Sequence, residues 1–288
     1  MQIIDIIFYI VFISQLLLIS HYFPRKLIGR ANFVFNTYPP SEYPKLYPKS
    51  MDQEEKGLAR FGRLNQGILW LGFVMLITLV AFDYSGPGRM NESFPIFFGL
   101  LQFLPYFLME LSGFNQFKLM RMADARTKRK ASLEARRLLE FVTPGMLALG
   151  AIFYSVYILV EVFTSQPGQF LDGESLSKIA AITASNILFV GIALYNMYGK
   201  KLNPHQTNGD RTQQIKTVLN SLIIMSILES NYFIFTAVSD AFDLKHLELA
   251  LNSFYFLIIA TISIKVTERI LHPGNTDFTV YKVDTGAD

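Results

Sequence analysis

The stretch IAAITASNILFVGIALYNMY, from Ile179 to Tyr198, decides the fold. It is 20 residues long and contains no Lys, Arg, Asp or Glu, while Lys178 precedes it and Lys200 follows it closely. A helix of roughly 20 apolar residues crosses a bilayer whose hydrocarbon core is about 30 Å thick. Lipid offers no hydrogen-bond partner to an open backbone, so such a segment must be helical. We therefore predict a transmembrane helix here.

Similar blocks without Lys or Arg recur along the chain. They cover about residues 3–21, 65–83, 95–114, 145–164, 218–238 and 247–264. Only 17% of the 288 residues are charged, whereas a soluble chain carries about 25%. The first block lacks a preceding basic residue and a small-residue cleavage site, so we expect it to be retained. The sequence thus predicts an all-α integral membrane protein, a seven-transmembrane-helix bundle formed by residues 1–270, with a short cytoplasmic tail at 271–288.

The positive charges alternate between the segments that connect these blocks. From the first connection to the tail, the segments carry eight, one, eight, one, four, one and three Lys or Arg, so alternate segments hold 23 and 3 of the 26. Cytoplasmic loops carry the excess of Lys and Arg. We therefore expect the N-terminus outside, the C-terminus in the cytoplasm, and insertion in the plasma (inner) membrane.

This topology resembles that of rhodopsins and G-protein-coupled receptors, but only in topology. A microbial rhodopsin needs a Lys at mid-depth in its seventh helix, and the nearest one here, Lys265, follows the seventh block. The extracellular disulfide of the receptors cannot form in a chain without Cys. No family motif supports the resemblance.

Two segments of the basic face are candidates for binding lipid or a partner. The loop 115–143 contains the run RTKRK, which either marks topology alone or binds anionic lipid or an acidic protein. The insert NTYPPSEYPKLYPKS, residues 36–50, carries three Tyr-Pro pairs. The candidate residues are Arg126, Lys128, Arg129 and Lys130 in the loop, and Tyr38, Tyr43 and Tyr47 in the insert. Nucleic acid is not an expected partner, because no stacking platform or reading module accompanies the charge.

The Tyr-Pro insert is predicted to be extended and polyproline-like, because proline fixes φ and removes a backbone donor. It either lies as a strap across the cytoplasmic mouth, with its rings on headgroups or other loops, or docks into an aromatic groove of a partner. Ser50 with Gln53 fits a capping box for a helix that continues into the second span. Thr143 and Pro144 fit the N-cap and first residue of the fourth.

Small residues recur every four positions in the fifth span. They are Ser177, Ala181 and Ser185, and also Ala180 and Ala184. Small residues at this spacing let membrane helices approach closely. We therefore expect this helix to be central in the bundle.

Two acids, Glu110 and Glu229, lie deep within predicted spans that hold no Lys or Arg. An ionised carboxylate there costs several kcal/mol or more. It is therefore protonated, binds a cation or lines a wet cavity, unless it is a neutral hydrogen-bonding group between helices. The candidate ion- or substrate-binding residues are Glu229, Glu110, Asn231, Asn196, Asn186 and Tyr154.

These features favour a transporter or channel-like protein that handles a proton, a cation or a small solute through a polar interior. The alternative is a membrane sensor or scaffold subunit that recruits a partner through its basic face, as a homo-oligomer or with another protein. The chain has no Cys, no H-E-x-x-H, no G-x-S-x-G and no Walker A loop, and its four His are far apart. We therefore expect no metal site, no cofactor and no catalytic residues, although an enzyme acting on lipid stays open.

Overall fold

The computed structural model describes residues 3–82, 94–124, 136–164, 173–242, 244, 247–270 and 276–283. Throughout these ranges the regular structure is helical. The elements are α1 (Ile3–Leu17), the π-helical turn η1 (Leu18–Tyr22), α2 (Phe23–Thr37), the 3-10 turn η2 (Pro44–Leu46), α3 (Met51–Ala81), α4 (Phe94–Ala123), α5 (Leu138–Phe141), α6 (Pro144–Thr164), α7 (Glu174–Tyr198), α8 (Asn208–Ala241), α9 (Glu248–Ile270) and the 3-10 turn η5 (Phe278–Tyr281).

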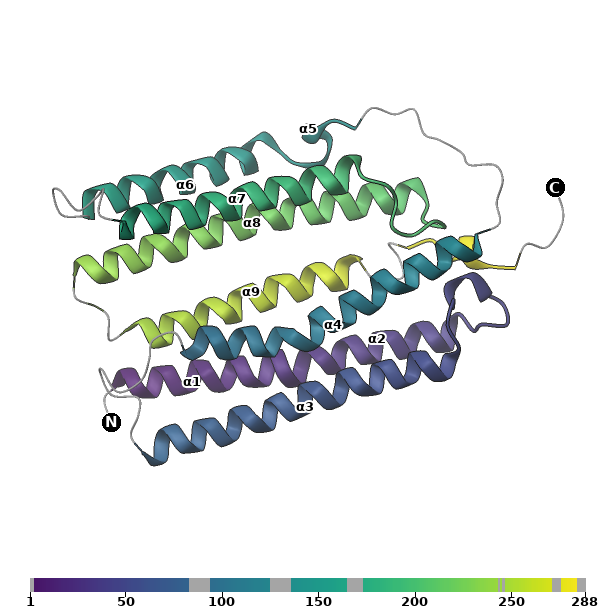
Figure 1. Ribbon diagram of the computed structural model, residues 1–288, viewed down its shortest axis with the longest axis horizontal. Helices are drawn as coiled ribbons and strands as arrows, with labels where there is room; N and C mark the ends of the chain where they lie inside the picture. Colours follow the sequence, from purple (N-terminus) through teal and green to yellow (C-terminus); the bar gives the residue numbers. More distant parts are fainter. Residues whose placement is uncertain are drawn as a thin grey trace.

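Within the described ranges, seven helices are long and apolar enough to cross a bilayer. The first is a continuous rod made of α1, η1 and α2, and the others are α3, α4, α6, α7, α8 and α9. Each coincides with one of the seven predicted blocks, and Figure 1 shows the rods aligned along one direction. The predicted seven-helix bundle is therefore confirmed.

Several rods extend beyond the predicted spans at the same end of the bundle, which is the right-hand end in Figure 1. α2 ends there at Thr37, α3 begins at Met51, α4 ends at Ala123 and α8 begins at Asn208. The 31 residues of α3 give a length of ~46 Å, which exceeds the ~30 Å of a hydrocarbon core. These extensions therefore hold basic residues such as Arg60 beyond the apolar section.

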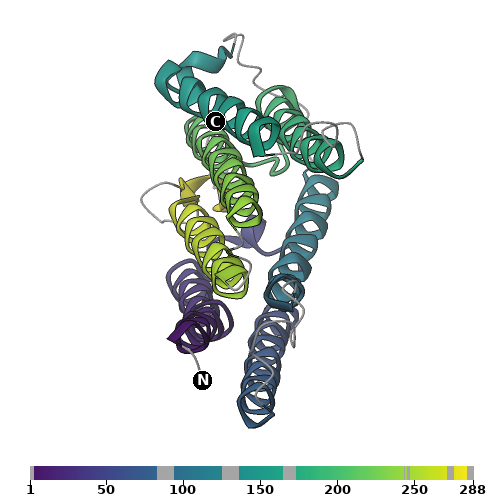
Figure 2. The same ribbon diagram turned by 90° about the vertical axis from the view of Figure 1, so that its left-hand side faces the viewer.

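The bundle has two groups of helices that α9 joins. α8 packs on α6, α7 and α9, whereas α9 packs on α8, α1 and α4. Phe8, Phe12 and Leu16 of α1 form one core with Leu76 and Phe98. A second core holds Met197, Ile215 and Leu219 of α7 and α8. Figure 2, seen along the helices, shows α9 beside α8 on one side and α1 on the other.

The expectation that the fifth span is central is wrong. This span is α7, which packs mainly on α8, and Ile187 and Val190 on it are 67% and 58% exposed. Ala180 and Ala184 of its small-residue stripe are exposed as well. Small side chains allow one close neighbour on one face, but they do not fix how many helices surround that face.

The helix starts are predicted with mixed success. α6 begins at Pro144, and the Thr143 hydroxyl accepts a hydrogen bond from the Met146 N–H at 3.4 Å, as predicted. α3 begins directly after Ser50, which occupies the N-cap position, but its side chain makes no capping hydrogen bond. The predicted capping box is therefore wrong, although the start of the helix is right.

The Tyr-Pro insert is compact, so the expectation of an extended polyproline segment is wrong. α2 runs directly into it, the N–H groups of Glu42 and Tyr43 donate to the Pro39 carbonyl at 3.1 and 2.9 Å, and η2 follows. A residue before proline avoids the helical region, and proline suits the first position of a turn. The Tyr38-Pro39 and Tyr43-Pro44 pairs therefore each start a new turn.

Candidate functional site

The carboxyl group of Glu229 lies in the interior of the group formed by α6, α7, α8 and α9. The Ser185 side chain of α7 hydrogen-bonds to it. Its Oε2 atom is buried and has no hydrogen-bond partner among the described residues. Tyr255 of α9 is close enough to interact electrostatically with the carboxylate. Side chains from α7 and α9 thus meet the acid from two sides.

Further hydrogen bonds surround this acid on the side of α6 and α7. The Ser226 hydroxyl of α8 donates to Asn186 Oδ1 at 2.5 Å, and Asn186 Nδ2 donates to the Ile182 carbonyl at 2.9 Å. The hydroxyls of Tyr154 and Thr183 are 2.7 Å apart and join α6 to α7. These bonds tie three helices together at one level.

Two tyrosines continue the cluster between α8 and α9. Tyr232 stacks on Tyr255, with ring centroids 4.5 Å apart, and its hydroxyl donates to Asn252 Oδ1 at 2.7 Å. Tyr157 of α6 packs its ring against Phe233, and its buried hydroxyl has no hydrogen-bond partner among the described residues. We define the polar layer by its residues, which are Tyr154, Tyr157, Thr183, Ser185, Asn186, Ser226, Glu229, Tyr232, Asn252 and Tyr255.

The packing of α9 gives the depth of the polar layer. Ala250 belongs to the same core as Phe8, and Ala260 belongs to a core with Ile19. Tyr255 lies midway between these alanines, so it is level with the section of the first rod between Phe8 and Ile19. Leu16, in the same section of the rod, lies against Gly72, near the centre of the predicted span 65–83. The polar layer therefore lies near the middle of the apolar section of the bundle.

The other predicted binding residues do not gather around Glu229. Glu110 is exposed on α4. Two contacts, one on each side of it along α4, show its position along the bundle axis. Tyr106 packs against Phe61 of α3, and Gln116 donates a hydrogen bond to Glu54 of α3. These contacts place it beside the charged section of α3 around Arg60, near the end of the predicted span 95–114 and not at its centre. Its predicted depth and its grouping with Glu229 are therefore not supported by the packing.

Two predicted asparagines are also placed elsewhere. Asn231 is two residues from Glu229 on α8, and residues at this spacing do not share a helix face. Asn196 is about 15 Å from Asn186 along α7, and it lines a separate pocket at the extended end of the bundle. Of the six predicted residues, the structure brings Glu229, Asn186 and Tyr154 together.

The three predicted tyrosines of the insert contact one another and the C-terminal segment 276–283. Tyr38 stacks on Phe278 with ring centroids 4.0 Å apart, and Tyr43 meets Tyr38 edge to face. The Tyr47 hydroxyl donates to the Tyr38 carbonyl at 2.7 Å, and the Val283 N–H donates to the Glu42 carbonyl at 3.2 Å. These contacts are intramolecular, as expected of a strap on other loops. Of the basic loop, Arg126, Lys128, Arg129 and Lys130 lie outside the described residues.

A second buried polar cluster lies between the first rod and α4. Gln15 Nε2 donates to Gln102 Oε1 at 2.8 Å, and Gln102 Nε2 donates to the Ser20 hydroxyl at 2.9 Å. The Tyr106 hydroxyl donates to the Ile19 carbonyl in the π-helical turn. Gln15 and Gln102 are both polar residues within apolar blocks, which is the signal in the sequence that points to this cluster. Ser20 gives none, because serine is common in membrane helices.

The chain matches no protein-family model, no curated protein and no solved structure. Within the described ranges, no three His, Asp or Glu side chains lie close enough together to hold a metal ion. The chemistry of the polar layer consists of one carboxyl group, hydroxyls and amides. These groups bind and pass protons, and their oxygens suit a small cation.

Proposed function

We propose that this integral, multi-pass membrane protein is a transporter or channel-like protein for a proton, a small cation or a small polar solute. The observation that carries the proposal is the carboxyl group of Glu229, which lies near mid-depth with one buried oxygen to which no described residue hydrogen-bonds. Ionisable residues inside membrane proteins mark transport pathways by default.

The polar layer supports a role in which Glu229 exchanges its proton or a bound cation. The carboxyl group of a buried Glu at this depth is stable when it is protonated, or when its ionised form is paired with a positive charge. The seven predicted spans contain no Lys or Arg that would supply such a charge. The hydroxyls of Ser185 and Tyr255 lie around the acid and are groups that can pass a proton onward.

The proposed orientation has the N-terminus outside and the extended end of the bundle in the cytoplasm of the plasma (inner) membrane. The distribution of 23 against 3 basic residues over alternate segments supports it. The helical extensions also carry their charges at one common end. In this orientation, the Tyr-Pro insert and the basic loop both face the cytoplasm, where the loop meets anionic lipid.

The proposal is tested by ion flux into liposomes that contain the purified chain. We expect a flux of H⁺, Na⁺ or K⁺ that Glu229→Gln lowers by about tenfold to a hundredfold, because a bond to a charged group contributes about 1.5–3 kcal/mol. Glu110→Gln is the matched control, since it makes the same chemical change at an exposed site. Unchanged flux in Glu229→Gln removes this residue from the pathway, and the absence of flux for all three ions contradicts the transport of a proton or a common cation.

A scaffold subunit is the second candidate, and the exposure of α7 favours it. This helix leaves Ala180 and Ala184 uncovered, and small residues at this spacing are typical of helix–helix contacts in membranes. Purification without crosslinking distinguishes the two functions. A stoichiometric partner, or a homo-oligomer that Ala184→Leu dissociates, supports the scaffold, whereas a monomer with flux supports the transporter.

A further inference from the structure

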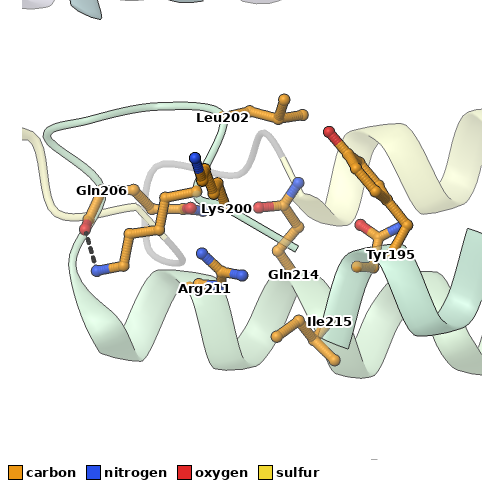
Figure 3. Close-up of a pocket in the computed structure, with 9 residues that line it drawn as sticks. Tyr195, Lys200, Leu202, Gln206, Arg211, Gln214 and Ile215 are labelled. Carbon is orange, nitrogen blue, oxygen red and sulfur yellow. Dashed lines mark hydrogen bonds between the residues drawn. The ribbon is translucent and has the colours of Figure 1, made fainter. Parts of the chain in front are cut away.

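A small pocket lies at the extended end of the bundle, where α7 ends and α8 begins. Its volume is about 30 Å³, which is room for one small polar group and not for a large organic ligand. Nine residues line it: Tyr195, Asn196, Lys200, Lys201, Leu202, Gln206, Arg211, Gln214 and Ile215. In Figure 3, Arg211 and Gln214 rise from α8 toward the loop that carries Lys200 and Gln206.

The lining of this pocket is strongly positive. Lys200, Lys201 and Arg211 contribute three positive charges, and none of the nine lining residues is acidic. Arg211 is only 7% exposed, so its charge is largely removed from bulk water. Asp210 precedes it on α8, but its carboxylate accepts the backbone N–H of Asp277 at 3.3 Å and does not line the pocket.

Two further arginines reach the same place from other elements. Arg136 donates to the Met197 carbonyl at 2.5 Å, and Arg121 donates to the carbonyls of Lys201 and Leu202 at 2.5 and 3.0 Å. Arg136 is near enough to Arg211 for their charges to repel each other. Five cations from three separate parts of the chain thus converge on the end of α7.

Hydrogen bonds from basic side chains to the last carbonyls of α7 account for only part of the positive charge around the pocket. The last carbonyls of a helix lack partners within the helix, and basic side chains commonly bind them, as Arg211 binds the Gly199 carbonyl. The end of a helix, however, carries only about half a negative charge. None of the nine residues that line the pocket is acidic, so the lining supplies no carboxylate to balance the charges of Arg211 and Lys200.

We propose that this pocket binds a phosphate group through Arg211 and Lys200, with the amide of Gln214 as a neutral donor. Guanidinium and ammonium groups are the usual ligands of phosphate in proteins. The phosphate belongs either to the headgroup of an anionic lipid or to a soluble ion. The site is separate from Glu229, so the proposal does not depend on transport.

The position of the pocket is compatible with either source. Tyr195 and Tyr198 near it are 58% and 65% exposed, and aromatic residues of this kind lie at the level of lipid headgroups. Basic pockets between membrane helices on the cytoplasmic side bind anionic headgroups. The lining includes the loop after α7, so a soluble ion also has a route from the water.

The test measures the thermal unfolding midpoint of the full chain in phosphatidylcholine nanodiscs at constant ionic strength. One arm adds inorganic phosphate, with chloride as the comparison, and the other replaces part of the lipid by phosphatidic acid. A ligand that binds the folded state raises the midpoint. A rise with phosphatidic acid alone identifies a lipid, and a rise with inorganic phosphate identifies a soluble ion. The absence of a rise in both arms overturns the proposal.

Three variants that each remove one positive charge locate the binding site. We expect Lys200→Gln and Arg211→Gln to weaken binding by about tenfold or more, because a hydrogen bond to a charged group contributes about 1.5–3 kcal/mol. Lys216→Gln is the control, since Lys216 is exposed on α8 and does not line the pocket. If Arg211→Gln does not fold, Lys200→Gln decides. Equal losses in Lys200→Gln and Lys216→Gln show general surface attraction and contradict a defined site.

Discussion

At the scale of single residues, unpaired buried polar atoms are the main feature of the interior. Among the described residues they are Gln15 Oε1, Asn65 Oδ1, Tyr157 Oη, Glu229 Oε2 and Ser253 Oγ. Each such atom costs about 1–3 kcal/mol unless water or a ligand satisfies it. Tyr157 and Glu229 both belong to the polar layer, which makes that layer the part of the interior with the greatest need for water or a bound ion.

The cluster around Gln102 has a structural role that a substitution tests. Gln102→Leu removes its bonds to Gln15 and Ser20 and leaves both partners buried, so we expect the free energy of unfolding to fall by about 1–3 kcal/mol. Gln53→Leu, at an exposed position on α3, is expected to change it by less than about 0.5 kcal/mol. Denaturant unfolding in detergent checks both values. Equal stability of the two variants would show that the buried bonds contribute nothing.

Sequence reasoning found the acid of the polar layer and some of its neighbours. Glu229, Asn186 and Tyr154 are conspicuous as polar residues in apolar blocks. Ser185 and Tyr255 gave no such signal, because serine and tyrosine are ordinary in membrane helices. Which polar residues meet depends on the rotation of each helix toward its neighbours, and periodicity within one helix does not contain that information.

At the scale of elements, the first rod contains a π-helical turn where it meets α4. Such a turn leaves a carbonyl without its normal partner within the helix. The Tyr106 hydroxyl of α4 donates to the Ile19 carbonyl within this turn, and Ser20 in the same turn accepts from Gln102. The irregular turn is thus stabilised by side chains of a neighbouring helix.

The contact between the Tyr-Pro insert and the C-terminal segment is expected to depend on alkaline pH. Burial, with a contribution from the Glu54 carboxylate, raises the pKa of Tyr47 from 10.0 to about 12. Burial also raises the pKa of Tyr281, with contributions from Asp210 and Asp277, although the hydrogen bond from Asn203 opposes the rise. Both hydroxyls therefore stay neutral to a higher pH in the folded protein than in the unfolded chain. The stability that this difference contributes is complete below about pH 10.

That stability is lost as the pH rises from about 10 to about 12, because the unfolded tyrosines ionise first. We expect the thermal unfolding midpoint to fall over this range, and to fall less steeply in Tyr47→Phe, which cannot ionise. Scanning calorimetry at a series of pH values measures both slopes, and every other side chain is common to the two proteins. Identical slopes would show that Tyr47 does not contribute.

At the scale of the whole molecule, the pattern of hydropathy was sufficient to predict the seven helices. The extension of α3 was also expected from Ser50, whereas those of α2, α4 and α8 were not, because they are amphipathic or polar and lie outside the apolar blocks. The arrangement of the helices was not predictable either. The apolar sections of α7 and α8 have similar mean hydropathy, yet α8 packs on more helices, since packing depends on both partners of every contact.

The proposed orientation is tested by cysteine labelling, for which the Cys-free chain is a natural background. We expect Ser41→Cys and Lys200→Cys to react with a membrane-impermeant maleimide only from the cytoplasmic side, and Gly173→Cys only from outside. Gly173 has a φ of 56°, so the fold of that variant is checked first by size-exclusion chromatography. Labelling of all three positions from one side would contradict the orientation.

The association of residues 276–283 with the insert has a consequence for biogenesis. This segment is translated after all seven helices, while its contacts, through Phe278 and Tyr281, are with Tyr38 near the first helix and Asn203 before the sixth. During synthesis, therefore, the insert emerges long before the aromatic ring that covers it. Tyr38 therefore stays uncovered on this side until the last helix has been synthesised, and the contact with Phe278 can form only afterwards.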